Sequence, residues 1–499
     1  MTVYNINKSI GRASSGVEYA QAYRNKVLRK IGVDQKYIFT DYIEKNILSF
    51  TDILGFEKEE VIWAYSFLAN RTNQYSSFSL DMFQKQLVDF EQKVIEDEFV
   101  IYAKGVLEYK LWKTSDGFVS TIDMLVNKKL YKRMYYTNSL AYENYYQEGV
   151  LTHRVFYDDD EQIAYTQYYE NNEIQTTVFS DRIIFGKQGF LNEFFEKLAI
   201  EASDFLIIDR NLDLASAVFK NSNNAKTAIV IHAEHFNHGK VFDDYLLWNN
   251  HYEYPFTNHK YVDYFITATQ KQKKTFTKQM SRLFGETFKS KVVAIPVGSA
   301  EEYSSVQTSP KNRYKLITAS RLADEKHVDD LVKAVIKAKP LIPELSFSIY
   351  GEGKHRNSLL QLIKENNASD YIKLMGHHEL TEIYRNHGVY VSASLSEGFG
   401  LSLLEALSNG LVFVGYDVDY GNAEFMIDGK NAIKIPYEKG HLQSEVLKNA
   451  ILSLYGIEPD GTKKENHFDI ESGMKVSYER SKAYTADKIK NSWEEILRD

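Results

Sequence analysis

Two glutamates eight positions apart carry the clearest chemical signal in this chain of 499 residues. Glu397 and Glu405 flank a Gly-Phe-Gly turn and an apolar-patterned segment that we expect to be helical. Gly398 and Gly400 lack a Cβ, so the backbone can approach a ligand closely. Unpaired N–H groups at a helix start favour an anion. A mostly helical span separates the acids by up to ~12 Å, which suits a ligand with hydroxyls at both ends and phosphate between them. A nucleotide-diphosphate sugar is such a ligand.

The same spacing is also typical of an ordinary surface helix, because glutamate is a good helix former. The strand-like run at 388–394, Gly-Val-Tyr-Val-Ser-Ala-Ser, favours the ligand hypothesis. A strand, a glycine turn and a helix in this order bind phosphate in α/β proteins.

Charged residues also follow two other strand-like runs. Arg321 and Lys326 come after the run 317–320, where two cations could neutralise a diphosphate. Charged helix starts are common, so this spacing alone carries little weight. His232 and His235 end another apolar run. A metal site there would need a third ligand, and a lone histidine at a strand end is usually structural.

A loop of small residues at 14–16 is another candidate anion site. It follows the strand-like run 3–6 and precedes a predicted helix at 17–30. Backbone N–H groups of Gly16 and Val17 at this helix start could bind phosphate. An ordinary turn would use the same small residues.

The composition is that of a globular protein with two or three domains, with 43% hydrophobic and 26% charged residues. A net charge of −8 argues against a general nucleic-acid binder. The chain has no cysteine, which excludes disulfides and thiolate metal sites and fits a cytoplasmic protein. We find neither a secretory signal pattern nor an apolar run of the ~18 residues that a membrane span needs. Peripheral membrane contact stays open.

Two series of alternating strands and helices enclose a different kind of region. Continuous apolar runs at 204–209 and 227–232 are typical of buried parallel strands, and a second series begins at 314. Before them, a mainly helical pattern at 46–90 gives way to short strands with polar turns, which predict an antiparallel meander. The sequence therefore predicts an α/β protein with two Rossmann-like domains and an antiparallel β-sheet insert in its N-terminal half.

The expected domain boundaries follow from these patterns. Residues 1–45 and 190–305 are expected to form the N-terminal Rossmann-like domain, and the last helix, 485–499, is expected to pack on it. Residues 46–189 form the inserted helical and β-meander domain. Residues 306–484 form the C-terminal domain that binds the nucleotide sugar.

The stretch from Glu397 to Glu405 is similar to the Glu-x7-Glu signature of retaining GT-B glycosyltransferases of family 4. The resemblance implies a GT-B fold, in which two Rossmann-like domains face a cleft. It assigns the donor sugar to Glu397 and the ribose hydroxyls to Glu405. The same turn would supply further contacts to the UDP-sugar from Gly398, Phe399, Gly400 and Leu401.

Other roles come from the same resemblance. Arg321 and Lys326 would stabilise the charge that develops on the diphosphate, and His235 would orient the sugar. Main-chain groups at Gly376 and His377 would hold the base. We expect no metal or other cofactor, because these cations and helix N-termini can do the charge work.

Four segments, 11–24, 232–235, 247–250 and 420–422, together resemble the family of GtfA catalytic subunits. These are bacterial O-GlcNAc transferases that initiate glycosylation of serine-rich-repeat adhesins. The resemblance implies transfer of N-acetylglucosamine from UDP-GlcNAc to Ser or Thr of an adhesin precursor. It also implies a companion GT-B-like subunit of the GtfB type in a hetero-oligomer. Arg12 stands where this subfamily is expected to carry an aromatic residue, which leaves the acceptor side open.

Two other functions share parts of the pattern. A wall teichoic acid α-glycosyltransferase would have the same GT-B halves and a β insert. A non-catalytic, chaperone-like subunit would be expected to lack the sugar-binding acid, so Glu397 argues against it. As the leading hypothesis, the protein is a cytoplasmic enzyme, with peripheral contact at the cytoplasmic face of the membrane left open.

Overall fold

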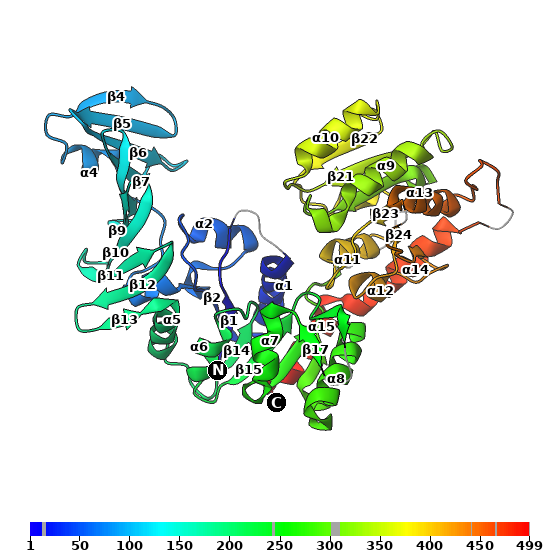
Figure 1. Ribbon diagram of the computed structural model, residues 1–499, viewed down its shortest axis with the longest axis horizontal. Coiled ribbons are helices and arrows are strands. Elements are labelled where there is room, and N and C mark those ends of the chain that lie inside the picture. The colour runs from blue at the N-terminus through cyan, green and yellow to red at the C-terminus, as the bar shows by residue number, and fades with distance from the viewer. Residues whose placement is uncertain (12–15, 242–244, 301–309, 441, 465–466, 499) are drawn as a thin grey trace. The chain divides into compact units, whose positions relative to one another are not determined.

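The computed structural model describes residues 1–11, 16–241, 245–300, 310–440, 442–464 and 467–498 (Figure 1). Arg12, the first two residues of the predicted loop 14–16, the predicted boundary between 305 and 306, and Asp499 lie outside these ranges. The chain divides into two compact units. The first comprises Met1–Ala22, Val33–Ile229 and Asn250–Asp263, and the second comprises Tyr23–Gly32, Val230–Asn249 and Tyr264–Asp499.

Parallel strands form the first sheet of the first unit. Five described strands pair in the order β15-β14-β1-β2-β3. Strand β14 is an unbroken apolar run that is buried along its whole length, as expected for a parallel strand covered on both faces. The strands are β1 (Thr2–Asn7), β2 (Asp34–Phe39), β3 (Val61–Trp63), β14 (Phe205–Ile208) and β15 (Lys226–Ile231), whose last two residues belong to the second unit.

Ten antiparallel strands form the second sheet of this unit. Each strand pairs with the next along the chain from β4 to β13, and this confirms the predicted meander. The strands are β4 (Glu91–Ile95), β5 (Phe99–Lys104), β6 (Leu107–Lys113), β7 (Val119–Val126), β8 (Lys129–Tyr136), β9 (Leu140–Gln147), β10 (Val150–Tyr157), β11 (Ile163–Glu170), β12 (Glu173–Phe179) and β13 (Ile183–Phe185).

The expectation of a mainly helical region at 46–90 is wrong. The described helices there are short and leave more than half of the residues non-helical: α2 (Leu48–Thr51), α3 (Ala64–Leu68), α4 (Leu80–Gln84) and the 3-10 helices Asp52–Leu54 and Lys58–Glu60. Strand β3 lies between α2 and α3 and extends the parallel sheet. Three residues are too few to show a strand's two-residue period. The sequence pattern therefore could not distinguish β3 from the neighbouring helical residues.

The second unit is built on a six-stranded parallel sheet. Its order is β22-β21-β20-β23-β24-β25. Two separate hydrophobic cores pack against it, one containing side chains of α9, α10 and α13 and the other side chains of α11. The strands are β20 (Lys315–Ala319), β21 (Ser346–Tyr350), β22 (Ile372–Gly376), β23 (Val389–Ser392), β24 (Val412–Tyr416) and β25 (Ala432–Ile435). Two further pairs are β16 (Phe236–Val241) with β17 (Leu246–Trp248), and β18 (Tyr264–Thr267) with β19 (Val292–Ala294).

Helices follow the strands in both units. None of the described helices combines the length and the hydropathy required to cross a bilayer. The final helix contacts α1, because the Arg24 guanidinium lies 5.5 Å from the centroid of the Trp493 ring. The remaining α-helices are α1 (Gly16–Ile31), α5 (Gly186–Lys197), α6 (Ala215–Lys220), α7 (Asn250–Thr257), α8 (Gln270–Phe284), α9 (Val328–Ala338), α10 (Arg356–Glu365), α11 (Leu401–Ser408), α12 (Gly421–Phe425), α13 (Gln443–Leu454), α14 (Ile470–Ser481) and α15 (Ala486–Arg498).

Candidate functional site

Neighbouring strands of the second unit bring Glu397 and Lys326 together. Strands β20 and β23 pair in parallel, so the loops after them leave the same edge of the sheet. Lys326 Nζ lies 2.5 Å from Glu397 Oε1. Only 15% and 18% of the two side chains is exposed, so water screens this ion pair less than an exposed one. The residues predicted for the diphosphate and for the sugar therefore form one charge pair.

The loop after β24 holds the Glu397 backbone in place. The carbonyl oxygen of Glu397 accepts hydrogen bonds from the backbone N–H of Tyr420 at 2.7 Å and of Gly421 at 2.8 Å. The Glu397 N–H donates to the Asp419 carbonyl at 3.3 Å. A Cβ on Gly421 would lie 2.1 Å from the Phe399 carbonyl oxygen. Only glycine therefore permits this close approach.

The predicted histidine lies in a third segment against the same loop. A Cβ on Gly398 would lie 2.0 Å from the carbonyl oxygen of His232, so the two backbones are in direct contact. His235 is fully buried, and its Nε2 lies 2.7 Å from Gln279 Oε1. The structure thus brings the His232–His235 segment and the Glu397 turn together, while the contact between His235 and a sugar stays a prediction.

Tyr420 connects these two segments, and it is not among the predicted site residues. Its hydroxyl donates to Glu234 Oε1 at 2.7 Å and lies 3.4 Å from His235 Nδ1. Burial, and then the charge of Glu234, raises the pKa of Tyr420, so its hydroxyl keeps its proton. The segment 420–422 drew attention through the family resemblance, but nothing in its sequence indicates which side chains Tyr420 contacts.

The second acid of the pair, Glu405, has different partners. It projects from α11, where the hydroxyl of Tyr384 donates to its Oε2 at 3.2 Å and that of Tyr23 donates to its Oε1 at 3.3 Å. Tyr384 belongs to the 3-10 helix Tyr384–Asn386 and is fully buried. Burial and the Glu405 charge raise the pKa of Tyr384, so it remains a donor. Among 36 tyrosines, no spacing singles out these two.

The remaining residues of the turn offer main-chain groups. The Phe399 ring is buried and packs against the rings of Phe425 and Tyr484, at 5.1 and 6.4 Å between centroids. Gly400 precedes α11 with a φ of +82°, and Leu401 is the first residue of that helix. A ligand at this turn would meet backbone rather than the Phe399 side chain.

Arg321 does not join the charge pair. Its guanidinium contacts Glu325 at 2.9 Å, and 65% of its side chain is exposed. Gly376 ends β22, and its carbonyl oxygen accepts from the N–H of Gly351 at 2.8 Å. His377 follows on the surface. The roles predicted for Arg321, Gly376 and His377 stay predictions.

Gly16 and Val17 begin α1 in the first unit. Gly16 is exposed, and a Cβ added there would meet no atom within 4 Å. His235, Lys326 and the two glutamates all belong to the second unit. The phosphate contact predicted for Gly16 and Val17 stays a prediction.

One group of potential metal ligands occurs among the described residues. Ligand atoms of His327, Asp329 and Asp330 lie within 4.8 Å of one another. Lys333 Nζ lies 2.6 Å from Asp329 Oδ2, so the lysine ammonium already supplies a positive charge to this carboxylate. Burial raises the pKa of Asp330. None of these residues belongs to the predicted site.

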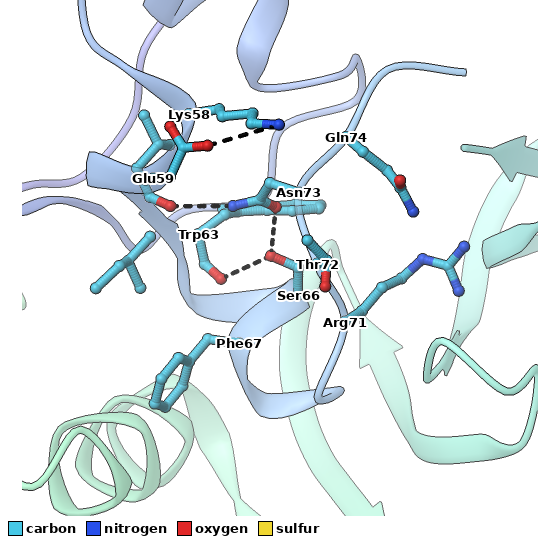
Figure 2. Close-up of a pocket in the computed structure, with 11 residues that line it drawn as sticks. Lys58, Glu59, Trp63, Ser66, Phe67, Arg71, Thr72, Asn73 and Gln74 are labelled. Atoms are coloured by element: carbon cyan, nitrogen blue, oxygen red, sulfur yellow. Dashed lines mark hydrogen bonds and ion pairs between the residues drawn. The ribbon is translucent and has the colours of Figure 1, made fainter. Parts of the chain in front are cut away.

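A pocket of about 350 Å³ lies in the first unit and includes no predicted site residue (Figure 2). Its polar groups bind one another: Ser66 Oγ lies 2.7 Å from Asn73 Oδ1, and Asn73 Nδ2 donates to the Val61 carbonyl at 3.2 Å. The Arg71 guanidinium donates to the carbonyl oxygens of Leu140 and Asp158 at 3.0 and 2.6 Å. The pocket therefore lies where residues 58–74 contact the start of β9 and the end of β10.

Known proteins resemble both the sequence and the fold. A family model described as glycosyl transferases group 1 matches residues 299–459, and one described as GtfA extended beta-sheet domain matches residues 92–180. The UDP-N-acetylglucosamine–peptide N-acetylglucosaminyltransferase GtfA subunit of Streptococcus agalactiae is 37% identical over 100% of this chain and 98% of its own length. That of Streptococcus pneumoniae is 37% identical over 100% of both chains.

Solved structures agree with the sequence matches. The pneumococcal O-GlcNAc transferase GtfA, in complex with UDP and GlcNAc, has a TM-score of 0.90 at 35% identity and covers 100% of this chain and 98% of its own. A chain of the GtfA/B complex has a TM-score of 0.88 at 35% identity, covering 100% of this chain and 99% of its own. TarM, with a TM-score of 0.76 and 18% identity over 100% of this chain and 99% of its own, shows the fold alone. These matches confirm the predicted GT-B fold class.

Proposed function

The chain belongs to the GtfA family of glycosyltransferase subunits, and on this premise we propose that it transfers N-acetylglucosamine from UDP-GlcNAc to a peptide. Its acceptor would be serine or threonine of a serine-rich-repeat adhesin precursor. The observation that carries the proposal is the Glu397–Lys326 pair, together with Glu405 between two tyrosine hydroxyls, in a chain that matches GtfA subunits along its full length. A non-catalytic subunit would be expected to lack the sugar-binding acid Glu397.

The proposed reaction retains the configuration of the sugar. The bond between the anomeric carbon and the UDP oxygen breaks, and the acceptor oxygen bonds to the same face of the sugar. The leaving phosphate takes the acceptor proton, so no side-chain base is needed. Glu397 and His235 orient the sugar, while Lys326 and Arg321 stabilise the charge on the diphosphate.

The nucleoside end of the donor would lie at Glu405. A carboxylate accepts hydrogen bonds from ribose hydroxyls, and the two tyrosine donors fix its orientation. Main-chain groups at Gly376 and His377 would meet the base, and Gly16 and Val17 the phosphate.

A companion GT-B-like subunit of the GtfB type is also part of the proposal. Its support is the relative that was crystallised as a GtfA/B complex. We place the hetero-oligomer in the cytoplasm, because the chain has no cysteine and its acceptor would be an adhesin not yet exported. Peripheral contact at the cytoplasmic face of the membrane stays open.

The test measures UDP release and the mass gain of a serine-rich peptide, using the full chain co-expressed with its companion subunit. We expect one HexNAc per modified site with UDP-GlcNAc as donor. No turnover with the companion present would contradict the proposal. Turnover only with poly(glycerol phosphate) or poly(ribitol phosphate) would instead support a teichoic acid transferase, and full activity of Glu397→Gln would indicate that the site is misassigned.

A further inference from the structure

Hydrogen bonds join Tyr420 both to the Glu397 turn and to the His235 segment. Its backbone N–H donates to the Glu397 carbonyl, while its hydroxyl donates to Glu234 and lies near His235 Nδ1. Our proposed function assigns Glu397 and His235 to the donor sugar. Tyr420 therefore links these two residues, in addition to the backbone contact between Gly398 and His232.

The surroundings of Tyr420 favour a fixed orientation. Only 1% of the residue is exposed, and its ring stacks on the His235 ring with 5.9 Å between centroids and 26° between planes. On the other side, Gln279 contacts Nε2 of the same histidine at 2.7 Å. A side chain confined in this way cannot adopt another rotamer without moving its neighbours.

The partner of the Tyr420 hydroxyl is held independently. The Glu234 carbonyl accepts from Asn249 Nδ2 at 2.9 Å, and the neighbouring Ala233 carbonyl accepts from Gln272 Nε2 at 2.9 Å. The Glu234 backbone is therefore anchored on both sides of the loop, and its carboxylate gives the tyrosine a charged acceptor at 2.7 Å.

We propose that Tyr420, with its acceptor Glu234, is a positioning residue for the transfer reaction. It sets the spacing between the His235 ring and the Glu397 carboxylate. The inference rests on the proposed function, because it needs a donor sugar that lies against these two residues. Small errors in such spacing cost about 10²-fold in rate when they reach ~1 Å.

The experiment uses the full chain with its companion subunit and compares Tyr420→Phe, Glu234→Ala, Glu234→Gln and the double variant Tyr420→Phe/Glu234→Ala. Rates are divided by the fraction of sites that bind UDP, measured by calorimetry, so that misfolded protein does not count. Tyr416→Phe is the matched control: Tyr416 is equally buried and donates one hydrogen bond, to Gln443 at 2.7 Å.

We expect Tyr420→Phe and Glu234→Ala each to lower kcat about tenfold or more, with the KM for UDP-GlcNAc within about twofold of wild type. Glu234→Gln should restore most of the rate, because its amide oxygen still accepts the hydrogen bond. The double variant should be no slower than the slower single variant, since both remove the same interaction. The control should keep its kcat.

Two results would overturn the inference: a kcat for Tyr420→Phe within about twofold of wild type, or losses in the double variant that multiply. An inactive wild type would instead contradict the proposed function, so the two failures are distinguishable.

Discussion

Glu397 and Glu405 are the same residue type eight positions apart, but the structure gives their carboxylates different hydrogen-bond partners. Glu397 lies on a loop, and its carboxylate is paired with the Lys326 ammonium. Glu405 lies on α11, and its carboxylate accepts from the neutral hydroxyls of Tyr23 and Tyr384. A charged partner suits a residue that works where charge moves, and neutral donors suit a residue that only holds a ligand.

The comparison predicts the largest loss for Glu397→Gln. We expect kcat to fall roughly 10³-fold, because the amide keeps the shape of the side chain but loses its charge beside Lys326 and the donor sugar. UDP release with a serine-rich peptide measures the loss. Thermal unfolding and pull-down of the companion subunit should match the wild type, and an activity within about tenfold of wild type would remove Glu397 from the reaction.

Lys326→Ala and Arg321→Ala test which cation serves the diphosphate. We expect kcat to fall about 10²-fold for Lys326, the shielded partner of Glu397, and about tenfold for exposed Arg321. The same steady-state assay measures both. Equal losses would show that Arg321 leaves Glu325 when the donor binds and stabilises the diphosphate charge as much as Lys326 does.

Tyr384→Phe should affect binding rather than turnover. Removing one donor to a carboxylate costs about 1.5 kcal/mol, so we expect the KM for UDP-GlcNAc to rise about tenfold with kcat within about twofold. The variant keeps the buried ring, and Tyr416→Phe is again the matched control. A fall in kcat at constant KM would mean that Glu405 acts in the chemical step.

The smallest expected effect is that of a chelator. In the proposed mechanism, Lys326, Arg321 and the start of α11 supply positive charge at the donor, so we expect EDTA to leave the rate unchanged. A parallel assay with added Mg²⁺ is the control. A loss of activity that Mg²⁺ or Mn²⁺ restores would show that a metal carries part of this charge.

The strand-end motifs were predictable because parallel strands deliver their following loops to one edge of a sheet. Arg321, Lys326 and Glu397 follow β20 and β23, which pair directly, and the structure joins Lys326 to Glu397. The rotamer of an exposed arginine has no such constraint, so the sequence could not place Arg321. The hydroxyl of Tyr420 contacts Glu234, 186 residues away, and that of Tyr384 contacts Glu405, 21 residues away. A local sequence pattern does not show such contacts.

Buried polar residues in strand β9 also have partners that a local sequence pattern does not show. Strand β9 contains Glu143 and Asn144, which are poor strand formers in isolation. Both are buried, and Glu143 accepts from the hydroxyls of Tyr145 and Tyr157 and pairs with Lys132. Tyr157 and Lys132 belong to the neighbouring strands β10 and β8, so these two partners exist only in the folded sheet.

Calorimetric titration of Glu397→Gln and Glu405→Gln with UDP tests the central claim most directly, since UDP lacks the sugar. If Glu397 serves the sugar and Glu405 the ribose, the first variant will bind UDP within about twofold of the wild-type Kd. The second will bind UDP about tenfold more weakly, the cost of a lost hydrogen bond to a charged group. Equal weakening of UDP binding in both variants would contradict the assignment of the two acids to opposite ends of the donor.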